Sequence, residues 1–204
     1  MAPLKRLFVI LLVAVWMPAV ATAADAPTAT APSKFIEGMA DKAIAALTEK
    51  DISRPDRITR FRALLNDHFD VKTIGRWVLG RYWQTATPAE RDEYLMLFED
   101  LIVATYVDRF TEYSGETLNV VKSEDVGSGE AVVSSRIART AGDPPIRVDW
   151  RLRQRDGQFR IVDVVVEGIS MGMTQRSEFA SVVSQNGGTL EGLLSKLREK
   201  RKHI

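Results

Sequence analysis

The sequence predicts an α+β domain in which helices come first, a twisted four-stranded antiparallel sheet follows, and helices return at the C-terminus. Three observations support this fold class. Apolar residues recur at helical spacing over residues 34–113 and again over residues 175–200. Between them, residues 117–168 alternate apolar and polar side chains, as strands do. Asp156-Gly157 separates two of these runs, and this dipeptide is typical of a two-residue hairpin turn.

The start of the chain has the composition of a cleaved export signal. Lys5 and Arg6 precede an unbroken apolar run over residues 7–17, and the small residues Ala-Thr-Ala end at Ala23. The run is shorter than the roughly 20 residues that a membrane-spanning helix needs. We therefore expect cleavage after Ala23, so that residues 1–23 are removed, and a location in the periplasm.

Composition limits the possible classes of function. After cleavage the chain would consist of a disordered, Pro- and Ala-rich leader over residues 24–33 and a single domain over residues 34–204. The sequence contains 28 basic and 27 acidic residues, and this balance gives no electrostatic basis for nucleic-acid binding. It contains no Cys, which excludes disulfides, thiolate metal ligands and a Cys nucleophile. Export without Cys is typical of a bacterial periplasmic protein.

Start and stop signals divide the segment before the sheet into four helices. The clearest start is Thr87-Pro88-Ala89-Glu90, where Thr87 and Glu90 form a capping box and Pro88 takes the first helical position. Gly80 ends a shorter helix. The expected helices run over residues 34–48 with Ser33 as N-cap, from Ser53 to a break at Phe69-Asp70, from Asp70 to Leu79, and from Thr87 to about Tyr113.

The four expected strands lie near residues 117–126, 130–140, 146–155 and 158–168. If the Asp156-Gly157 turn sets the register of the last two strands, Trp150 lies opposite Asp163 and Val148 lies opposite Val165. One face of this hairpin then carries Ile146, Val148, Trp150, Leu152, Phe159, Ile161 and Val165. The other face carries Arg147, Asp149, Arg151 and Arg153, mixed with Val162, Val164 and Val166. Because the last strand is apolar on both faces, we expect apolar cover on each side of it.

Few residues could carry catalytic chemistry. The sequence has two His residues, His68 and His203, and no His and carboxylate have the spacing of metal ligands. No nucleotide-binding glycine loop or nucleophile motif occurs. We therefore expect neither a metal site nor a cofactor.

Asp163 has two open interpretations. Its expected place on the apolar face requires hydrogen bonds, because a buried carboxylate is costly without them. It could be a general base in a conical pocket like that of ketosteroid isomerases. Alternatively, it could accept hydrogen bonds from the Trp150 indole or from loop backbone. Glu167, near the end of the same strand, fits a turn or a pocket rim better than catalysis.

Basic side chains gather in two places. Arg147, Arg151, Arg153 and Arg155 alternate along one expected strand, where they could bind an anionic headgroup or a membrane surface, or form a solvated face. The tail carries Lys196, Arg198, Lys200, Arg201 and Lys202. This tail could contact anionic lipid, worth roughly 1 kcal/mol per residue, or complement the dipole of the last helix.

Several motifs, taken in order, resemble those of one known family over residues 34–200. They are Phe69-Asp70, Val78-Leu79-Gly80 with Trp83, Thr87-Pro88-Ala89-Glu90 with Phe98 and Thr105-Tyr106, Tyr113-Ser114-Gly115, Phe159-Arg160-Ile161-Val162-Asp163-Val164, Val166-Glu167-Gly168-Ile169-Ser170, and Arg176 with Phe179. The family is the MlaC/toluene-tolerance family of periplasmic phospholipid carriers. Two departures are Phe159 in place of the family's usual Trp and Met171-Gly172-Met173-Thr174 in place of a Leu-Val stretch. A hopanoid-associated branch of this family is therefore an alternative for the lipid.

The resemblance implies a fold and a function. The sheet and the helices packed on it would enclose an apolar cavity for acyl chains, with the headgroup near the mouth. The carrier, most simply a monomer, would pass phospholipid between an outer-membrane lipoprotein complex and an inner-membrane ABC transporter, with no reaction and no cofactor. Such transport would maintain the lipid asymmetry of the outer membrane. The alternatives from other classes are an enzyme that uses Asp163 as base and an interaction adaptor with a filled core.

The expected lipid-binding side chains come from the sheet and the long helix. From the sheet and its exit we expect Val148, Trp150, Leu152, Ile161, Val165 and Ile169. From the long helix we expect Phe98, Leu101 and Tyr106.

Overall fold

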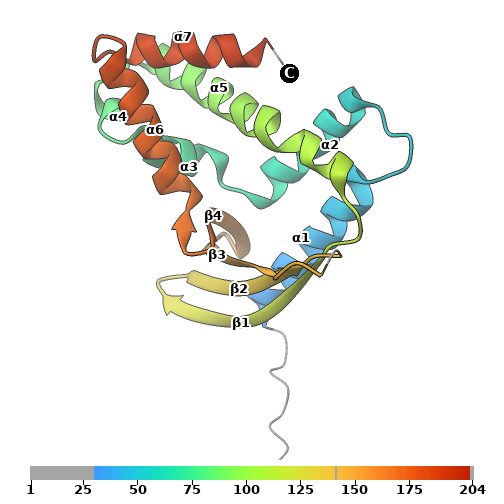
Figure 1. The fold of residues 1–204 in the computed structure, drawn as a ribbon. Coiled ribbons are helices and arrows are strands. Elements are labelled where there is room, and N and C mark those ends of the chain that lie inside the picture. The colour runs from blue at the N-terminus through green and yellow to red at the C-terminus, as the bar shows by residue number, and fades with distance from the viewer. Residues whose placement is uncertain (1–29, 141, 203–204) are drawn as a thin grey trace, which may run out of the picture.

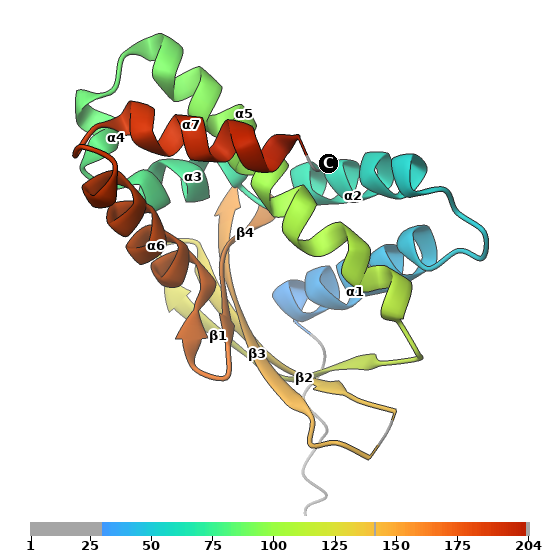
Figure 2. The same cartoon turned by 45° about the horizontal axis from the view of Figure 1, so that its top comes forward.

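The helices gather on one side of a curved sheet, as the computed structural model shows in two views (Figures 1 and 2). The structure describes residues 30–140 and 142–202, so the expected export signal and most of the expected leader lie outside the described residues. Before the sheet come α1 (Ala31–Leu47), α2 (Arg54–His68), α3 (Val71–Leu79), α4 (Tyr82–Thr85), α5 (Pro88–Tyr106) and the 3-10 helix η1 (Val107–Glu112). The strands are β1 (Thr117–Gly127), β2 (Glu130–Ala138), β3 (Ile146–Arg155), β4 (Gln158–Val166) and β5 (Ile169–Ser170). The chain continues with α6 (Met171–Gln185) and α7 (Leu190–Arg201).

The predicted helix starts within the N-terminal half are largely confirmed by their capping hydrogen bonds. The Thr87 hydroxyl accepts the Glu90 N–H at 3.3 Å, and the Glu90 carboxylate accepts the Thr87 N–H at 2.8 Å. Ser53 and Asp70 each accept the backbone N–H three residues later, at 3.2 and 3.1 Å. These bonds satisfy N–H groups that have no partner within the helix, and this fixes the starts of α2, α3 and α5.

The first helix begins earlier than predicted. Thr30 is its N-cap and Ala31 its first residue, whereas we expected a start at Lys34. Residues 31–33 were predicted to belong to the disordered leader, and for them that prediction is wrong. Pro32 in the first turn explains the difference, because a proline there needs no hydrogen-bond partner for its nitrogen.

Two further boundaries differ, and one short helix was not expected. The α-helical part of α5 ends at Tyr106, and η1 replaces the predicted last turn toward Tyr113. α6 begins at Met171 rather than Gln175, because the Ser170 hydroxyl accepts the N–H of the residue three positions later at 3.0 Å. The short helix α4 lies between α3 and α5.

The sheet is an antiparallel meander in the order β1-β2-β3-β4-β5. It has five strands in the described residues, not the four that we predicted, because the short β5 pairs with the end of β4. The α+β class and the order of helices, meander and helices are confirmed.

The register of the β3–β4 hairpin is as predicted only near its turn. From the hairpin tip to Ile161 the pairs are those we expected, but Val162 then has no partner and forms a β-bulge. Beyond the bulge the pairs are Arg151–Asp163, Trp150–Val164, Asp149–Val165 and Val148–Val166. Two predicted pairs are therefore wrong, Trp150 with Asp163 and Val148 with Val165. A shift of one residue moves each following side chain of β4 to the opposite face.

Two separate hydrophobic clusters stabilise the described fold. The helical cluster joins α2, α3, α5, α6 and α7, and its fully buried members include Val78, Tyr94, Leu97, Val103, Val183 and Leu194. The sheet cluster packs α1 against β2, β3 and β4 through Ile36, Met39, Ala131, Val133, Leu152 and Ile161. Within the described residues, Phe69 alone packs against both clusters.

Backbone contacts at Phe69 also connect the helices to the sheet. Phe69 forms a parallel bridge with Ile161, and the Asp70 N–H donates to the Ile161 carbonyl at 3.0 Å. Arg160 donates to the carbonyl of Asn66 at 2.8 Å and to that of the next residue. The end of α2 is thereby attached to the start of β4.

No helix in the described residues combines the length and hydropathy needed to cross a membrane.

Candidate functional site

The face of the sheet toward the helices carries an apolar strip. Its members are neighbours within or across β2, β3 and β4, and they are Ile137, Ile146, Val148, Trp150, Val164 and Val166. We call this set the inner strip. Val148 is buried, while the other five side chains are only partly buried. A contiguous apolar surface that the fold leaves partly open is typical of a site that binds something apolar.

The one polar atom among the side chains of the inner strip is fully satisfied. The Trp150 indole N–H donates to the Ser135 hydroxyl at 2.9 Å, and that hydroxyl donates to the Val148 carbonyl at 3.0 Å. The predicted hydrogen bond from the Trp150 indole to Asp163 is therefore not formed. The ring can present an apolar surface without leaving a donor unpaired.

Leu152 and Ile161 lie beside the inner strip but belong to the filled sheet cluster. Both are essentially fully buried, and α1 covers them with Ile36 and Met39. The structure therefore brings together four predicted site residues of the sheet, of which Val148 and Trp150 lie in the strip and two lie in packed core.

The predicted residues of α5 lie away from the sheet. Phe98 is buried in the helical cluster, with its ring centroid 5.8 Å from Tyr94 and 6.2 Å from Phe179. Leu101 is buried in the same cluster, and Tyr106 is 39% exposed with Arg109 over its ring. α5 packs mainly against α7, α3 and α2, and no strand is among its main contacts. The structure does not bring these three side chains to the inner strip.

The last two predicted residues lie outside the strip as well. Val165 pairs with Asp149, so it is on the opposite face of the sheet from Val148. This corrects the predicted face, and the bulge at Val162 is the cause. Ile169 is in β5, where it is 59% exposed.

Asp163 caps the helix that follows the sheet. Its Oδ1 accepts the N–H groups of Val164 at 2.9 Å and Gly172 at 3.1 Å, and its Oδ2 accepts the Ser170 hydroxyl at 2.7 Å. These are hydrogen bonds from backbone and a neighbouring side chain, as one of the two interpretations expected. The other interpretation, a base in an apolar pocket, loses the residue on which it depended, because Asp163 shares a face with Asp149 rather than with the inner strip.

Glu167 serves a turn. It has a positive φ of 49°, and its carboxylate accepts the backbone N–H of Arg147. This bond secures the link from β4 to β5. Neither carboxylate therefore points to acid–base chemistry, and the inner strip itself contains no ionisable side chain.

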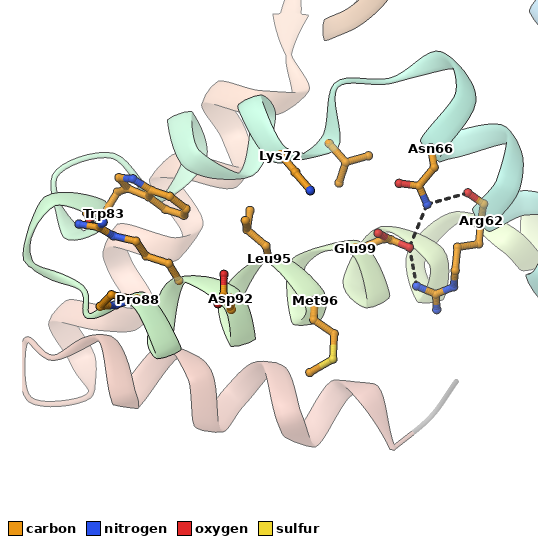
Figure 3. Close-up of a pocket in the computed structure, with 11 residues that line it drawn as sticks. Arg62, Asn66, Lys72, Trp83, Pro88, Asp92, Leu95, Met96 and Glu99 are labelled. Carbon is orange, nitrogen blue, oxygen red and sulfur yellow. Dashed lines mark hydrogen bonds and ion pairs between the residues drawn. The ribbon is translucent and has the colours of Figure 1, made fainter.

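Two concavities lie elsewhere on the molecule. The larger, a groove of about 590 Å³, runs between α2, α3 and α5 and is shown in Figure 3. Lys72 and Asp92 point into it, and Arg62 closes one end through an ion pair with Glu99 at 2.7 Å. The smaller, about 280 Å³, lies near the start of α1 beside Phe159. Neither is lined by the inner strip, and among the described residues no His, Cys, Asp and Glu side chains group to hold a metal ion.

Comparisons with known proteins place this geometry in context. A family model described as MlaC protein matches residues 37–199. The intermembrane phospholipid transport system binding protein MlaC of Haemophilus influenzae is 24% identical over 177 residues, which cover 83% of this chain and 82% of that protein. The toluene tolerance protein ttg2D of Pseudomonas putida is 23% identical over 190 residues, covering 92% and 86%.

A solved structure shares the fold. It is the phospholipid-binding protein from Ralstonia solanacearum, determined in complex with a phospholipid. The TM-score is 0.70 at 21% identity, with 83% of this chain and 96% of that chain covered. At this identity the likeness is one of fold.

Proposed function

The chain belongs to the MlaC protein family, and from this membership we propose that it binds phospholipid and carries it through the periplasm. The observation that carries the proposal is the inner strip, an open apolar surface without an ionisable side chain. The name of the Haemophilus relative supports a phospholipid ligand, and the fold is that of a protein determined with one bound.

Acyl chains would lie between the sheet and the helical cluster, against the inner strip. Trp150, Val164 and Val166 are partly buried there, so hydrocarbon can replace water at their side chains. Each methylene removed from water contributes roughly 0.8 kcal/mol. The exchange that matters is from membrane to protein, however, and both environments are apolar. The net free energy can therefore be small, and a carrier can both load and release its lipid.

The carrier would pass lipid between complexes of the outer and inner membranes. The export signal predicted at residues 1–23 supports a periplasmic location, and the name of the Haemophilus relative describes an intermembrane system. The partners we propose are an outer-membrane lipoprotein complex and an inner-membrane ABC transporter. No catalytic step is part of this proposal.

Native mass spectrometry of the chain released from cells without detergent tests the function. We expect the mass of the protein plus bound phospholipid, and extraction of that lipid distinguishes a phospholipid from a hopanoid-type ligand. A bare mass, together with no uptake of a fluorescent phospholipid by the protein, would overturn the proposal.

Two adjacent valines test the location of the acyl chains. Val164→Glu places a carboxylate on the inner strip, and Val165→Glu places the same group one residue away on the opposite face. A charge buried against hydrocarbon is costly, so we expect Val164→Glu to weaken phospholipid uptake at least about tenfold and Val165→Glu to leave it unchanged. Circular dichroism verifies that both variants fold. If Val164→Glu does not fold, Val166→Asn serves in its place. Equal uptake by the folded strip variant and the control would rule out this location.

A further inference from the structure

The outer face of the sheet, away from the helices, is rich in charge. Alternation along the paired strands places there the charged side chains of Lys122, Glu124, Glu130, Arg136, Arg147, Asp149, Arg151, Arg153, Arg155, Arg160 and Asp163, of which Arg155 is paired with Asp70 at 3.6 Å. We call this set the outer face. Figures 1 and 2 show that most helices lie on the other side, and Arg136, Arg147 and Arg151 of the outer face are exposed.

The acidic groups of the outer face are already engaged. Three make ion pairs within it, Glu124 with Lys122 at 2.9 Å, Glu130 with Arg153 at 2.7 Å, and Asp149 with Arg147 at 2.7 Å. The fourth, Asp163, accepts its hydrogen bonds from the start of α6. Three guanidinium groups of the outer face make no ion pair with any described residue. Arg160 donates to backbone carbonyls at the end of α2, whereas Arg136 and Arg151 are exposed.

One of these arginines has an unfavourable neighbour. Arg136 lies directly opposite Arg147 in the β2–β3 ladder, and like charges in that position destabilise a sheet. The Arg147 side chain is held by Asp149, whose pKa lies below its ordinary value because hydrogen bonds from Ser134 and Arg147 outweigh the effect of burial. Asp149 thus compensates Arg147 but not Arg136, and an uncompensated local conflict of this kind is expected at functional sites.

The composition of the outer face favours a protein partner over a bilayer. The positions of β1 to β4 whose side chains point to this side of the sheet include no Trp, Tyr or Phe, the side chains that anchor proteins at a membrane interface. Acidic groups lie between the basic ones, and a uniformly anionic bilayer would repel them, whereas a patterned protein surface can match both signs. Arg is also enriched at protein interfaces, because its planar fork binds carboxylates with two hydrogen bonds.

We propose that the outer face, through Arg136 and Arg151, docks onto a carboxylate-bearing surface of the inner-membrane protein complex with which this carrier exchanges lipid. The inference rests on the proposed function and adds the partner surface to it. The inner strip and the outer face are opposite sides of the same sheet, so docking leaves the lipid contacts free. The two roles can therefore be separated by mutation.

A transfer assay with two acceptors tests the surface. The chain is loaded with a fluorescent phospholipid and mixed with native inner-membrane vesicles of the bacterium that encodes it, or with liposomes made from the lipids of those vesicles. The test variant is Arg136→Glu/Arg151→Glu, which breaks no ion pair among the described residues. The control is Lys42→Glu/Lys72→Glu, with the same charge change on exposed positions of α1 and α3.

We expect the test variant to transfer lipid to native vesicles about tenfold or more slowly at low salt, because charge complementarity acts mainly on association rate. Wild-type transfer should also slow as salt is added. The control, uptake of lipid, and transfer to liposomes should be unchanged.

Three results would overturn the inference. Unchanged transfer to native vesicles removes the outer face as the docking surface, and equal slowing with liposomes assigns the arginines to lipid headgroups. Equal slowing by the control assigns the effect to net charge or to the groove that Lys72 lines (Figure 3). A wild-type chain that takes up no phospholipid would overturn the proposed function as well, whereas these three results leave that function intact.

Discussion

Val162 decides which side chains of β4 face the helices. Because it bulges out of the ladder, Val164 and Val166 join the inner strip, while Asp163 and Val165 turn to the outer face. The same bulge carries Asp163 to the start of α6, where it accepts the Gly172 N–H and the Ser170 hydroxyl. One residue thus separates an apolar face from a polar one and gives a carboxylate a structural partner.

Removing the Asp163 carboxylate should weaken the start of α6. We expect Asp163→Ala to lower the free energy of unfolding by about 1–3 kcal/mol, because the N–H of Gly172 loses its acceptor at a buried position. Asp163→Asn keeps one acceptor oxygen and should cost less. Urea denaturation followed by circular dichroism measures both. Phospholipid uptake by the folded variants should persist. Loss of uptake in Asp163→Asn at unchanged stability would contradict a purely structural role.

At the scale of elements, close packing rather than helix propensity positions α6 on α3. A Cβ atom added at Gly172 would lie 2.7 Å from Cζ3 of Trp77, so the two helices approach to a distance that only glycine allows. Arg176 then lies over the Trp77 ring at 5.5 Å, and its guanidinium is near Gly80 at the end of α3. The Met- and Gly-containing departure from the family pattern is thus the first turn of a packed helix.

Two glycine substitutions separate packing from propensity. Gly172→Ala should destabilise the protein by about 1–3 kcal/mol, because the methyl group forces Trp77 or α6 to move. Gly38→Ala, inside α1 with no atom within 4 Å of the new methyl group, should stabilise by about 0.5–1 kcal/mol. Thermal unfolding of the two variants shows whether each substitution raises or lowers stability. Stabilisation in both cases would contradict the close approach of α3 and α6.

The attachment of α7 to α5 should depend on pH. Hydrogen bonds from Arg198 lower the pKa of Glu93 on α5 and the pKa of Glu191 on α7. A lowered pKa stabilises the fold above the ordinary carboxylate value, and this contribution is lost as pH falls through the lowered pKa.

Arg198→Met should therefore be slightly less stable than wild type near neutral pH, and the effect is small because these groups are largely exposed to solvent. The difference should shrink as pH falls from neutral through the lowered pKa values of Glu93 and Glu191, because both carboxylates are then protonated. Denaturation midpoints across that range measure it. A difference that stays constant with pH would show that Arg198 contributes packing rather than charge.

At the scale of the whole molecule, the described fold is two hydrophobic clusters connected at few points. The helical cluster is filled by Tyr94, Phe98 and Phe179, and burial raises the pKa of Tyr94, whose hydroxyl donates to the Gly75 carbonyl at 3.0 Å. The sheet cluster is filled beneath α1. Acyl chains bound as we propose, between the two filled clusters, would require neither core to open.

Phe69 should be essential to the coupling of the two clusters. Phe69→Ala removes a half-buried ring that both clusters contact, and we expect a loss of about 2–3 kcal/mol of stability. Tryptophan fluorescence and circular dichroism should then report unfolding transitions at different denaturant concentrations. Phe61→Ala, which touches only the helical cluster, is the control. Coincident transitions in Phe69→Ala would show that the clusters are coupled elsewhere.

Much of the secondary structure could be predicted because its signals are local. The capping box at Thr87, the N-caps Ser53 and Asp70, and the Asp156-Gly157 turn depend on residues within a few positions of one another. The family resemblance was also readable, since it rests on the order of motifs along the chain, and the family match confirms it. The candidate site was harder to predict from the sequence. Phe98 and Trp150 have the same apolar character in sequence, but they pack in different clusters.

The sequence by itself determined the fold class, the family and most of the helices and strands, because hydrophobic period, caps and turns act over short separations. Only the tertiary structure decided that Val162 bulges, that Val164 rather than Val165 faces the helices, and that Asp163 caps α6. Those outcomes depend on contacts between residues distant in the chain, such as Phe69 with Ile161 and α3 with α6. No local sequence pattern determines which face of β4 lies toward the helices. Both faces carry valines, so either orientation would bury similar side chains.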